Sequence, residues 1–165
     1  MALHDHCSYC GAAYAQGAAW PRVCAACGET TWRNPLPVAV VLLPVDTDHG
    51  RGIVVVRRDI EPMRGELALP GGFIELGETW QEAAARELRE ETTILADAEE
   101  VRLFDVHSVR TSNLIVFGVL PPRPFAELPA SVRTEESIGF EISIGAQELC
   151  FPTHTEVLAR YFASA

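Results

Sequence analysis

The chain has 165 residues, of which 48% are hydrophobic, enough to bury the core of one domain with a small appendage. Its 23 acidic and 13 basic residues give a formal net charge of −10, which argues against sequence-independent binding to nucleic acid or to an anionic membrane. No apolar run is long enough to span a bilayer, and the first residues lack a signal-peptide pattern, so we expect a cytoplasmic protein.

Two pairs of cysteines stand near the start of the chain. Cys7 and Cys10 form one C-x-x-C motif, Cys24 and Cys27 form a second, and a glycine follows each pair. This number and spacing of cysteines is typical of a tetrahedral structural zinc site. The alternative is two disulfides or inert core thiols, which a chain without a secretion signal disfavours. We therefore predict a zinc ribbon over residues 1–34, in which Zn²⁺ contributes directly to folding.

An apolar run over residues 38–43 follows two prolines that end the ribbon. Because the run is continuous and does not alternate, it predicts a strand buried on both faces. Gly50 and Gly52 indicate a loop into a second strand over residues 53–56. The densest basic region follows and could bind an anionic substrate, or could equally be solvated charges paired with nearby acids. It consists of Arg57, Arg58 and Arg64.

A capping box predicts the first helix. Thr79 is followed three residues later by Glu82, so a helix should begin at Trp80 and end at about Thr92. At about 100° per residue, three of its acidic residues share one face. These are Glu87, Glu90 and Glu91. Like charges this close repel one another unless a cation lies among them, and carboxylates that also meet substrate phosphates suit Mg²⁺.

The same stretch resembles the Nudix box. Gly72, Glu78 and the run Arg-Glu-Leu-Arg-Glu-Glu at residues 86–91 match the box at fixed spacing. Thr93 stands where the consensus has a glycine that caps the helix, so the way in which the helix ends differs from the family pattern. The resemblance implies an α/β fold, namely the Nudix α/β/α sandwich with a mixed sheet, over residues 35–165.

The resemblance and the chemistry of the box assign its metal ligands. Hydrolysis of a diphosphate needs an activated water and neutralised phosphate charge, which clustered divalent ions supply. We assign Glu87, Glu90 and Glu91 as ligands of Mg²⁺ or Mn²⁺. By resemblance, the carbonyl of Gly72 or of Gly71 would complete the metal shell.

Other charged residues are expected to support these ligands. Arg86 would orient Glu87 or Glu78 through a charged hydrogen bond, although an ordinary pair along the helix is the alternative. Nudix enzymes often place a further glutamate, as general base or ligand, in a loop before a later strand. Glu135 and Glu136 both stand at such a place, and the sequence does not choose between them. We take Glu136 as the candidate catalytic residue.

The second half of the chain predicts three more strands and a closing helix. The strands are expected at residues 101–106, 114–120 and 138–144. Thr153 and Glu156 form a second capping box, which predicts a helix that docks on the sheet by an apolar face. That face contains Val157, Leu158, Tyr161 and Phe162.

Several single residues have two interpretations. His107, Arg110 and Asn113 are candidate ligand contacts, but each alone is more often ordinary surface. His154 could reach the active site from the start of the last helix, although a structural role at the helix end is favoured. Cys150 is more typical of a small buried apolar residue than of a nucleophile.

A zinc ribbon ahead of a Nudix box is similar to the branch that includes NADH and FAD pyrophosphatases. The Ser-Gln-Pro-Trp pattern of NADH pyrophosphatases is absent, which weakens NADH as the substrate. The resemblance implies metal-dependent cleavage of a diphosphate linkage in FAD, NADH, ADP-ribose or a related nucleotide, giving NMP and a phosphorylated X. The alternative is a nucleotide sensor without catalysis; an isomerase has no support from the ribbon. We expect a small nucleotide as partner, no nucleic acid or membrane, and leave open the homodimer that many Nudix proteins form.

Overall fold

The computed structural model describes residues 4–110 and 113–164. The chain divides into two compact units, Met1–Pro35 and Leu36–Ala165. None of the helices within the described ranges is both long and apolar enough to cross a bilayer.

The first unit is built on two short antiparallel strands, β1 (Arg22–Val23) and β2 (Thr30–Thr31). Its two C-x-x-C motifs fold as equivalent turns, in which the glycine N–H donates to the carbonyl of the first cysteine. The Gly11 N–H donates to Cys7 and the Gly28 N–H to Cys24, both at 2.9 Å. Both glycines have positive φ angles of 74° and 78°, which residues with a Cβ rarely adopt.

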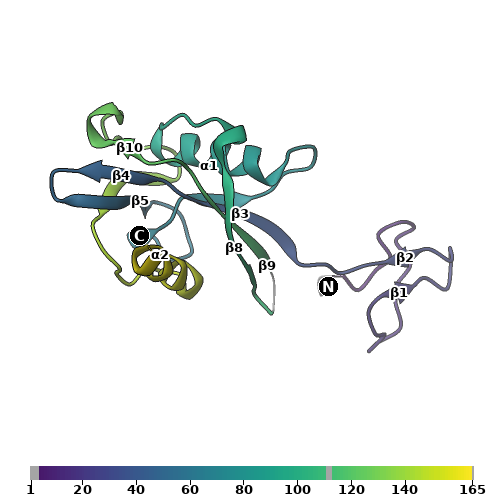
Figure 1. Ribbon diagram of the computed structural model, residues 1–165. Helices are drawn as coiled ribbons and strands as arrows, with labels where there is room; N and C mark the ends of the chain where they lie inside the picture. The colour runs from purple at the N-terminus through teal and green to yellow at the C-terminus, as the bar shows by residue number, and fades with distance from the viewer. Residues whose placement is uncertain (1–3, 111–112, 165) are drawn as a thin grey trace. The chain divides into compact units, whose positions relative to one another are not determined.

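The second unit contains two mixed sheets and two helices (Figure 1). In the first sheet the strand order is β7-β3-β9-β8, and β3 runs parallel to β9 while the other neighbours are antiparallel. The bounds of these strands are β3 Leu36–Leu42, β7 Gly71–Phe73, β8 Arg102–Ser108 and β9 Asn113–Val119.

In the second sheet the strand order is β10-β4-β5-β11, and β6 also pairs with β5. Only the β10–β4 pair of this sheet is parallel. The bounds of the strands are β4 Pro44–Thr47, β5 Gly50–Arg58, β6 Leu67–Ala68, β10 Arg123–Pro124 and β11 Ser137–Ser143. Two short 3₁₀ helices, η1 (Ala98–Glu100) and η2 (Phe125–Glu127), lie in the connections.

The helix α1 (Trp80–Thr92) has the predicted bounds and the predicted capping box. The Thr79 hydroxyl accepts from the Glu82 N–H at 3.2 Å, and the Glu82 carboxylate accepts from the Thr79 N–H at 2.6 Å. Thr93 ends the helix in the left-handed conformation, with φ at 63°, and its N–H donates to the Arg89 carbonyl. A threonine therefore takes the geometry that the family consensus gives to glycine.

Strands β3 and β5 separate two apolar cores, with α1 on one side and the closing helix α2 (Pro152–Ser164) on the other (Figure 1). Along β3, Ala39 and Val41 face the α1 core, whereas Val40 and Leu42 face the α2 core. All four side chains are at most 1% exposed, which confirms the prediction of a strand buried on both faces. The unit is thus the expected α/β/α sandwich.

Two local predictions were wrong. Gly52 lies inside β5 and does not mark a loop, because the close approach of β11 leaves no room for a side chain: a Cβ there would lie 2.4 Å from Ile142 and 2.8 Å from the Ser143 carbonyl. The closing helix begins at Pro152, so Thr153 lies within its first turn and is not the cap. Proline suits the first helical position, where no N–H donor is needed.

Candidate metal centre and active site

Three glutamates meet between α1 and the loop that precedes β11. One carboxylate oxygen from each of Glu87, Glu91 and Glu136 lies within 4.8 Å of the others. Glu87 and Glu91 are one turn apart on α1 and are buried, whereas Glu136 is exposed. Of the two loop acids that the sequence left open, Glu136 joins the group, and Glu135 lies outside it among the described residues.

The short strand β7 makes room for the two buried carboxylates. The Gly71 N–H donates to Oε2 of Glu91 at 3.0 Å. Gly72 faces Glu87 so closely that a Cβ on it would lie 2.3 Å from Oε1 of Glu87. The sequence predicted that Gly71 or Gly72 offers a carbonyl to a metal ion. It did not predict that the Gly71 N–H donates to Glu91 or that Glu87 occupies the space of a side chain at Gly72. The two adjacent glycines were the only sequence signal for these contacts.

Arg86 holds three carboxylates in place from one guanidinium. It pairs with Glu78 at 2.8 Å, with Glu87 at 2.7 Å and with Glu90 at 3.1 Å. It also donates to the carbonyl of Phe73, at the end of β7, at 2.9 Å. Both partners predicted for Arg86, Glu87 and Glu78, are contacted, and Glu78 also accepts from a backbone N–H of its own loop at 2.7 Å. Because Arg86 contacts both Glu87 and the end of β7, it fixes the Glu87 carboxylate relative to that strand.

Burial makes the negative charge at this place costly. Burial and, to a smaller extent, the Glu87 and Glu136 carboxylates raise the pKa of Glu91 to about 8, against the opposing effect of the Gly71 hydrogen bond. Burial likewise raises the pKa of Glu87, although the hydrogen bond and charge of Arg86 oppose the shift. Buried oxygen ligands with an excess of negative charge are the donor set that hard divalent cations prefer. The residues present thus fit a divalent metal ion.

Glu90, predicted as a third ligand on α1, lies outside this group in the described part of the chain. Its side chain is 46% exposed and pairs with Arg86 and with Arg89, the latter at 3.0 Å. The structure therefore brings together two of the three predicted helix ligands and adds the loop glutamate.

The three arginines of the basic region are placed differently from one another. Arg57 pairs with Glu141 at 2.7 Å, and Arg64 pairs with Asp59 at 2.7 Å. Arg58 is buried, and its Nε donates to the Pro62 carbonyl at 3.0 Å. Successive side chains on a strand point to opposite faces, so Arg57 and Arg58 do not form one patch.

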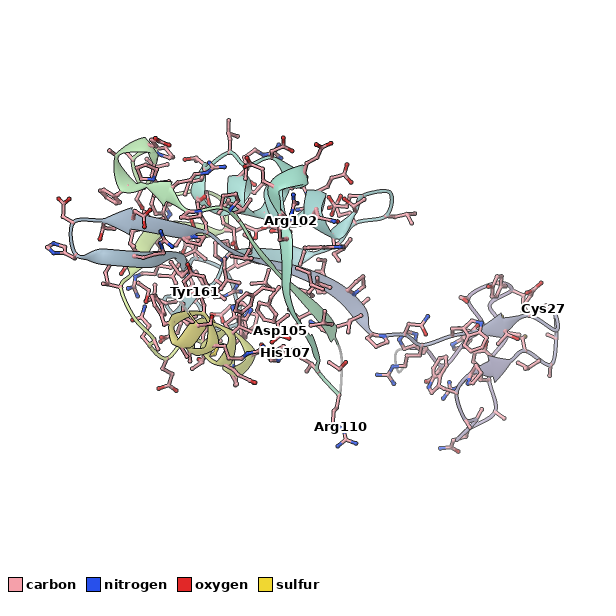
Figure 2. All side chains as sticks on the ribbon, viewed as in Figure 1. Cys27, Arg102, Asp105, His107, Arg110 and Tyr161 are labelled. Carbon is pink, nitrogen blue, oxygen red and sulfur yellow. The ribbon has the colours of Figure 1, made fainter. Side chains whose placement is uncertain are left out.

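His107 lies on the α2 side of the sheet, away from the glutamates. Its Nε2 lies 2.8 Å from Asp105, and its ring packs against Phe117 of the α2 core at 5.4 Å. Figure 2 shows Asp105 and His107 side by side and Arg110 beyond the end of β8. His154 is buried, its Nδ1 accepts from a backbone N–H at 3.2 Å, and burial lowers its pKa to about 3, which fits the structural role favoured from the sequence.

The four cysteines of the first unit form a second group. Their sulfurs lie within 4.8 Å of one another, with Cys7 and Cys27 at 3.8 Å and Cys10 and Cys24 at 3.6 Å. All four are free, so no disulfide links them. Backbone N–H groups of the second turn lower the pKa of Cys24, which stabilises the thiolate that a metal ion requires. The cluster is compatible with a zinc ribbon.

Comparisons with known proteins agree with this geometry. The model of the NUDIX domain matches residues 35–141. An ADP-ribose pyrophosphatase of Methanocaldococcus jannaschii is 49% identical over 43 residues, which are 26% of this chain and 25% of that protein. The NAD-capped RNA hydrolase NudC of Edwardsiella ictaluri is 34% identical over 92 residues, 55% of this chain and 34% of that protein. The match thus spans only a quarter to a third of these relatives' lengths.

A solved structure resembles nearly the whole chain. The NUDIX hydrolase from Nitrosomonas europaea superimposes with a TM-score of 0.75, covering 97% of this chain and 91% of that one at 24% sequence identity. This likeness shows the fold alone. The match of the NUDIX domain to most of the chain, together with the α/β/α sandwich and the glutamates of α1, shows that the chain belongs to the NUDIX family.

Proposed function

We propose that the chain hydrolyses the diphosphate linkage of a nucleoside diphosphate derivative, such as FAD, NADH or ADP-ribose, to NMP and a phosphorylated X. The observation that carries this proposal is the meeting of Glu87, Glu91 and Glu136. Mg²⁺ or Mn²⁺ would be held by Glu87 and Glu91, with Glu90 and the carbonyl of Gly72 as further proposed ligands.

The chemistry follows from the environments of the three acids. A divalent ion held by Glu87 and Glu91 would polarise the phosphate oxygens and lower the pKa of a water molecule bound to it. The oxygen of that water forms a bond to phosphorus, the bridging P–O bond breaks, and the leaving phosphate keeps the bonding electrons. Glu136, the exposed member of the group, takes the proton of the water as general base, because it is reached from solvent. Arg86 holds Glu87 in place during the reaction.

Substrate phosphates need positive charge in a chain whose net charge is −10. We assign Arg57, Arg58 and Arg64 to this role. Arg57 and Arg64 retain side-chain exposures of 38% and 58%, so a phosphate can reach both guanidinium groups. Arg58 is buried and contributes through its charge.

Two features rank the substrates. One relative is named an ADP-ribose pyrophosphatase and another an NAD-capped RNA hydrolase. ADP-ribose and NAD, which these names mention, are both adenine nucleotides with a diphosphate linkage. The strongly negative charge disfavours a long RNA, which would need a basic surface. Small adenine nucleotides are therefore favoured over capped RNA.

The experiment is to incubate the protein with Mg²⁺ or Mn²⁺ and NADH, FAD, ADP-ribose, diadenosine polyphosphates and 8-oxo-dGTP, and to separate the products by chromatography. We expect release of AMP from one adenine nucleotide, a loss of about 10²-fold or more in Glu91→Gln, and no change in Glu148→Gln, which alters an exposed acid outside the site. Full activity of Glu91→Gln would refute the assignment. Tight binding without turnover would instead support a nucleotide sensor.

We further propose that residues 1–34 form a structural zinc ribbon with Cys7, Cys10, Cys24 and Cys27 as ligands. Four thiolates close the coordination shell, so this zinc would stabilise the unit and take no part in catalysis. Free cysteines of this kind suit a cytoplasmic protein. Elemental analysis of the purified chain should find one zinc per chain, and Cys10→Ser should lower it; a zinc-free, folded first unit would contradict the proposal.

A further inference from the structure

The loop that carries Glu136 determines where its carboxylate lies. Glu136 lies 45 residues along the chain from Glu91, outside the helix that positions the other two glutamates. The Glu136 side chain is exposed, so close packing around it does not keep its carboxylate within 4.8 Å of the other two. The bonds that retain the loop therefore set the place of the Glu136 carboxylate.

Asp59, the first residue after β5, holds this loop at two points. Its backbone N–H donates to the Glu136 carbonyl at 2.8 Å. Its carboxylate, only 8% exposed, accepts from Arg133, which opens the loop. The other carboxylate oxygen accepts from Arg64, with the Nη2 nitrogen at 2.7 Å. One buried carboxylate thus joins the end of β5 to both ends of the segment from Arg133 to Glu136.

Ser137 holds the far end of the same loop. Its side chain is fully buried, and its hydroxyl donates to the backbone carbonyl of Glu91. The loop closes on itself as well, since the Ser137 N–H donates to the Thr134 hydroxyl at 3.1 Å and the Thr134 N–H donates to the Ser137 carbonyl at 2.9 Å. The loop is therefore tied directly to the residue whose carboxylate Glu136 approaches.

The effect of these bonds on the position of the loop must be separated from their effect on stability. Both arginines that pair with Asp59 are largely exposed, at 62% for Arg133 and 58% for Arg64, whereas the Asp59 carboxylate is 8% exposed. The chain offers a comparison in Asp46, which is 51% exposed and pairs with Arg51 at 2.7 Å across the β4–β5 hairpin, at the opposite end of β5 from Asp59. Asp46→Ala therefore controls for the loss of an aspartate–arginine pair that does not contact the loop.

We propose that Asp59 is a positioning residue, which sets the distance of the Glu136 carboxylate from Glu87 and Glu91 by holding the loop through Arg133 and the backbone. The consequence for turnover rests on the function proposed above. The consequence for the loop does not, because Asp59 contacts the loop whatever the chain binds.

The first measurement is hydrogen exchange of the backbone amides at residues 131–137 in the wild type, Asp59→Ala and Asp46→Ala. Asp59→Ala should raise the exchange rate of these amides by about tenfold or more, whereas Asp46→Ala should leave it unchanged. Equal exchange in all three proteins would overturn the proposal, whether or not the chain is an enzyme. If exchange changes as expected but the wild type turns over none of the nucleotides, the proposed function fails and the positioning role stands.

The second measurement separates positioning from a general loss of stability. Asp59→Ala should lower kcat by about 10- to 100-fold, since a misplacement near 1 Å costs about 10²-fold. In a Glu136→Gln background the same substitution should lower kcat no further. Arg133→Lys should retain the rate that Arg133→Ala loses. Additive effects of Asp59→Ala and Glu136→Gln, or equal losses in both Arg133 variants, would contradict the proposal.

Discussion

Replacing Gly72 with alanine tests the site with the smallest change that the structure allows. An added Cβ would lie 2.3 Å from Oε1 of Glu87, where ordinary contact begins at 3.4 Å, so the carboxylate must shift by about 1.1 Å. The shift would also stretch the 2.7 Å pair between Glu87 and Arg86. Because a misplacement of about 1 Å in a catalytic constellation costs about 10²-fold in rate, we expect Gly72→Ala to lower kcat by about that factor.

The assay compares Gly72→Ala with Gly145→Ala. A Cβ on Gly145 would meet no atom within 4 Å, and its φ is not positive, so this variant controls for the loss of glycine. Both proteins would be tested for turnover with Mn²⁺, for Mn²⁺ affinity by electron paramagnetic resonance, and for the midpoint of urea unfolding. We expect weaker Mn²⁺ binding and slower turnover only in Gly72→Ala. Wild-type values for both quantities would refute the role given to Glu87.

Two further predictions concern stability. Thr93 is exposed and has φ at 63°, so Thr93→Gly should raise the free energy of unfolding by about 0.5–1 kcal/mol in urea titrations; a decrease would show that its side chain contributes more than the strain costs. The folded pKa of His154 is about 3, below its unfolded value near 6.5, so protonation favours unfolding, and stability present above pH 6.5 is lost as the pH falls toward 3. Between pH 6.5 and pH 5 the wild type should lose about 1.6 kcal/mol more than His154→Asn, in which the amide oxygen can still accept from the Leu69 N–H; parallel pH curves would contradict this.

Local signals predicted the elements that depend on neighbouring residues. The capping box at Thr79 and Glu82 is a contact between residues three apart, so the sequence contains all of it. The continuous apolar run of β3 likewise reports burial on both faces without knowledge of its neighbours. Glu87 and Glu91 could be assigned to one face because helical spacing alone places them there.

The remaining features depend on contacts between distant parts of the chain. Glu135 and Glu136 are adjacent and chemically alike, and only the packing of their loop on α1 brings Glu136 to the other glutamates. Gly52 read as a loop residue, because the approach of β11 lies 90 residues away in the sequence. Glu90 lies on the helix face predicted for the metal ligands, but its carboxylate pairs with Arg86 and Arg89 and lies outside the group of three glutamates in the described residues.

The burial of β3 between two cores has a consequence for how the second unit melts. Alternate residues of β3 contribute to opposite cores. If one core loses its packing, the strand that also forms part of the other core is disturbed. Detachment of α2 would expose Val40 and Leu42, and detachment of α1 would expose their neighbours Ala39 and Val41. Residues 36–165 should therefore unfold in a single cooperative transition, in which probes on the two helices report the same midpoint.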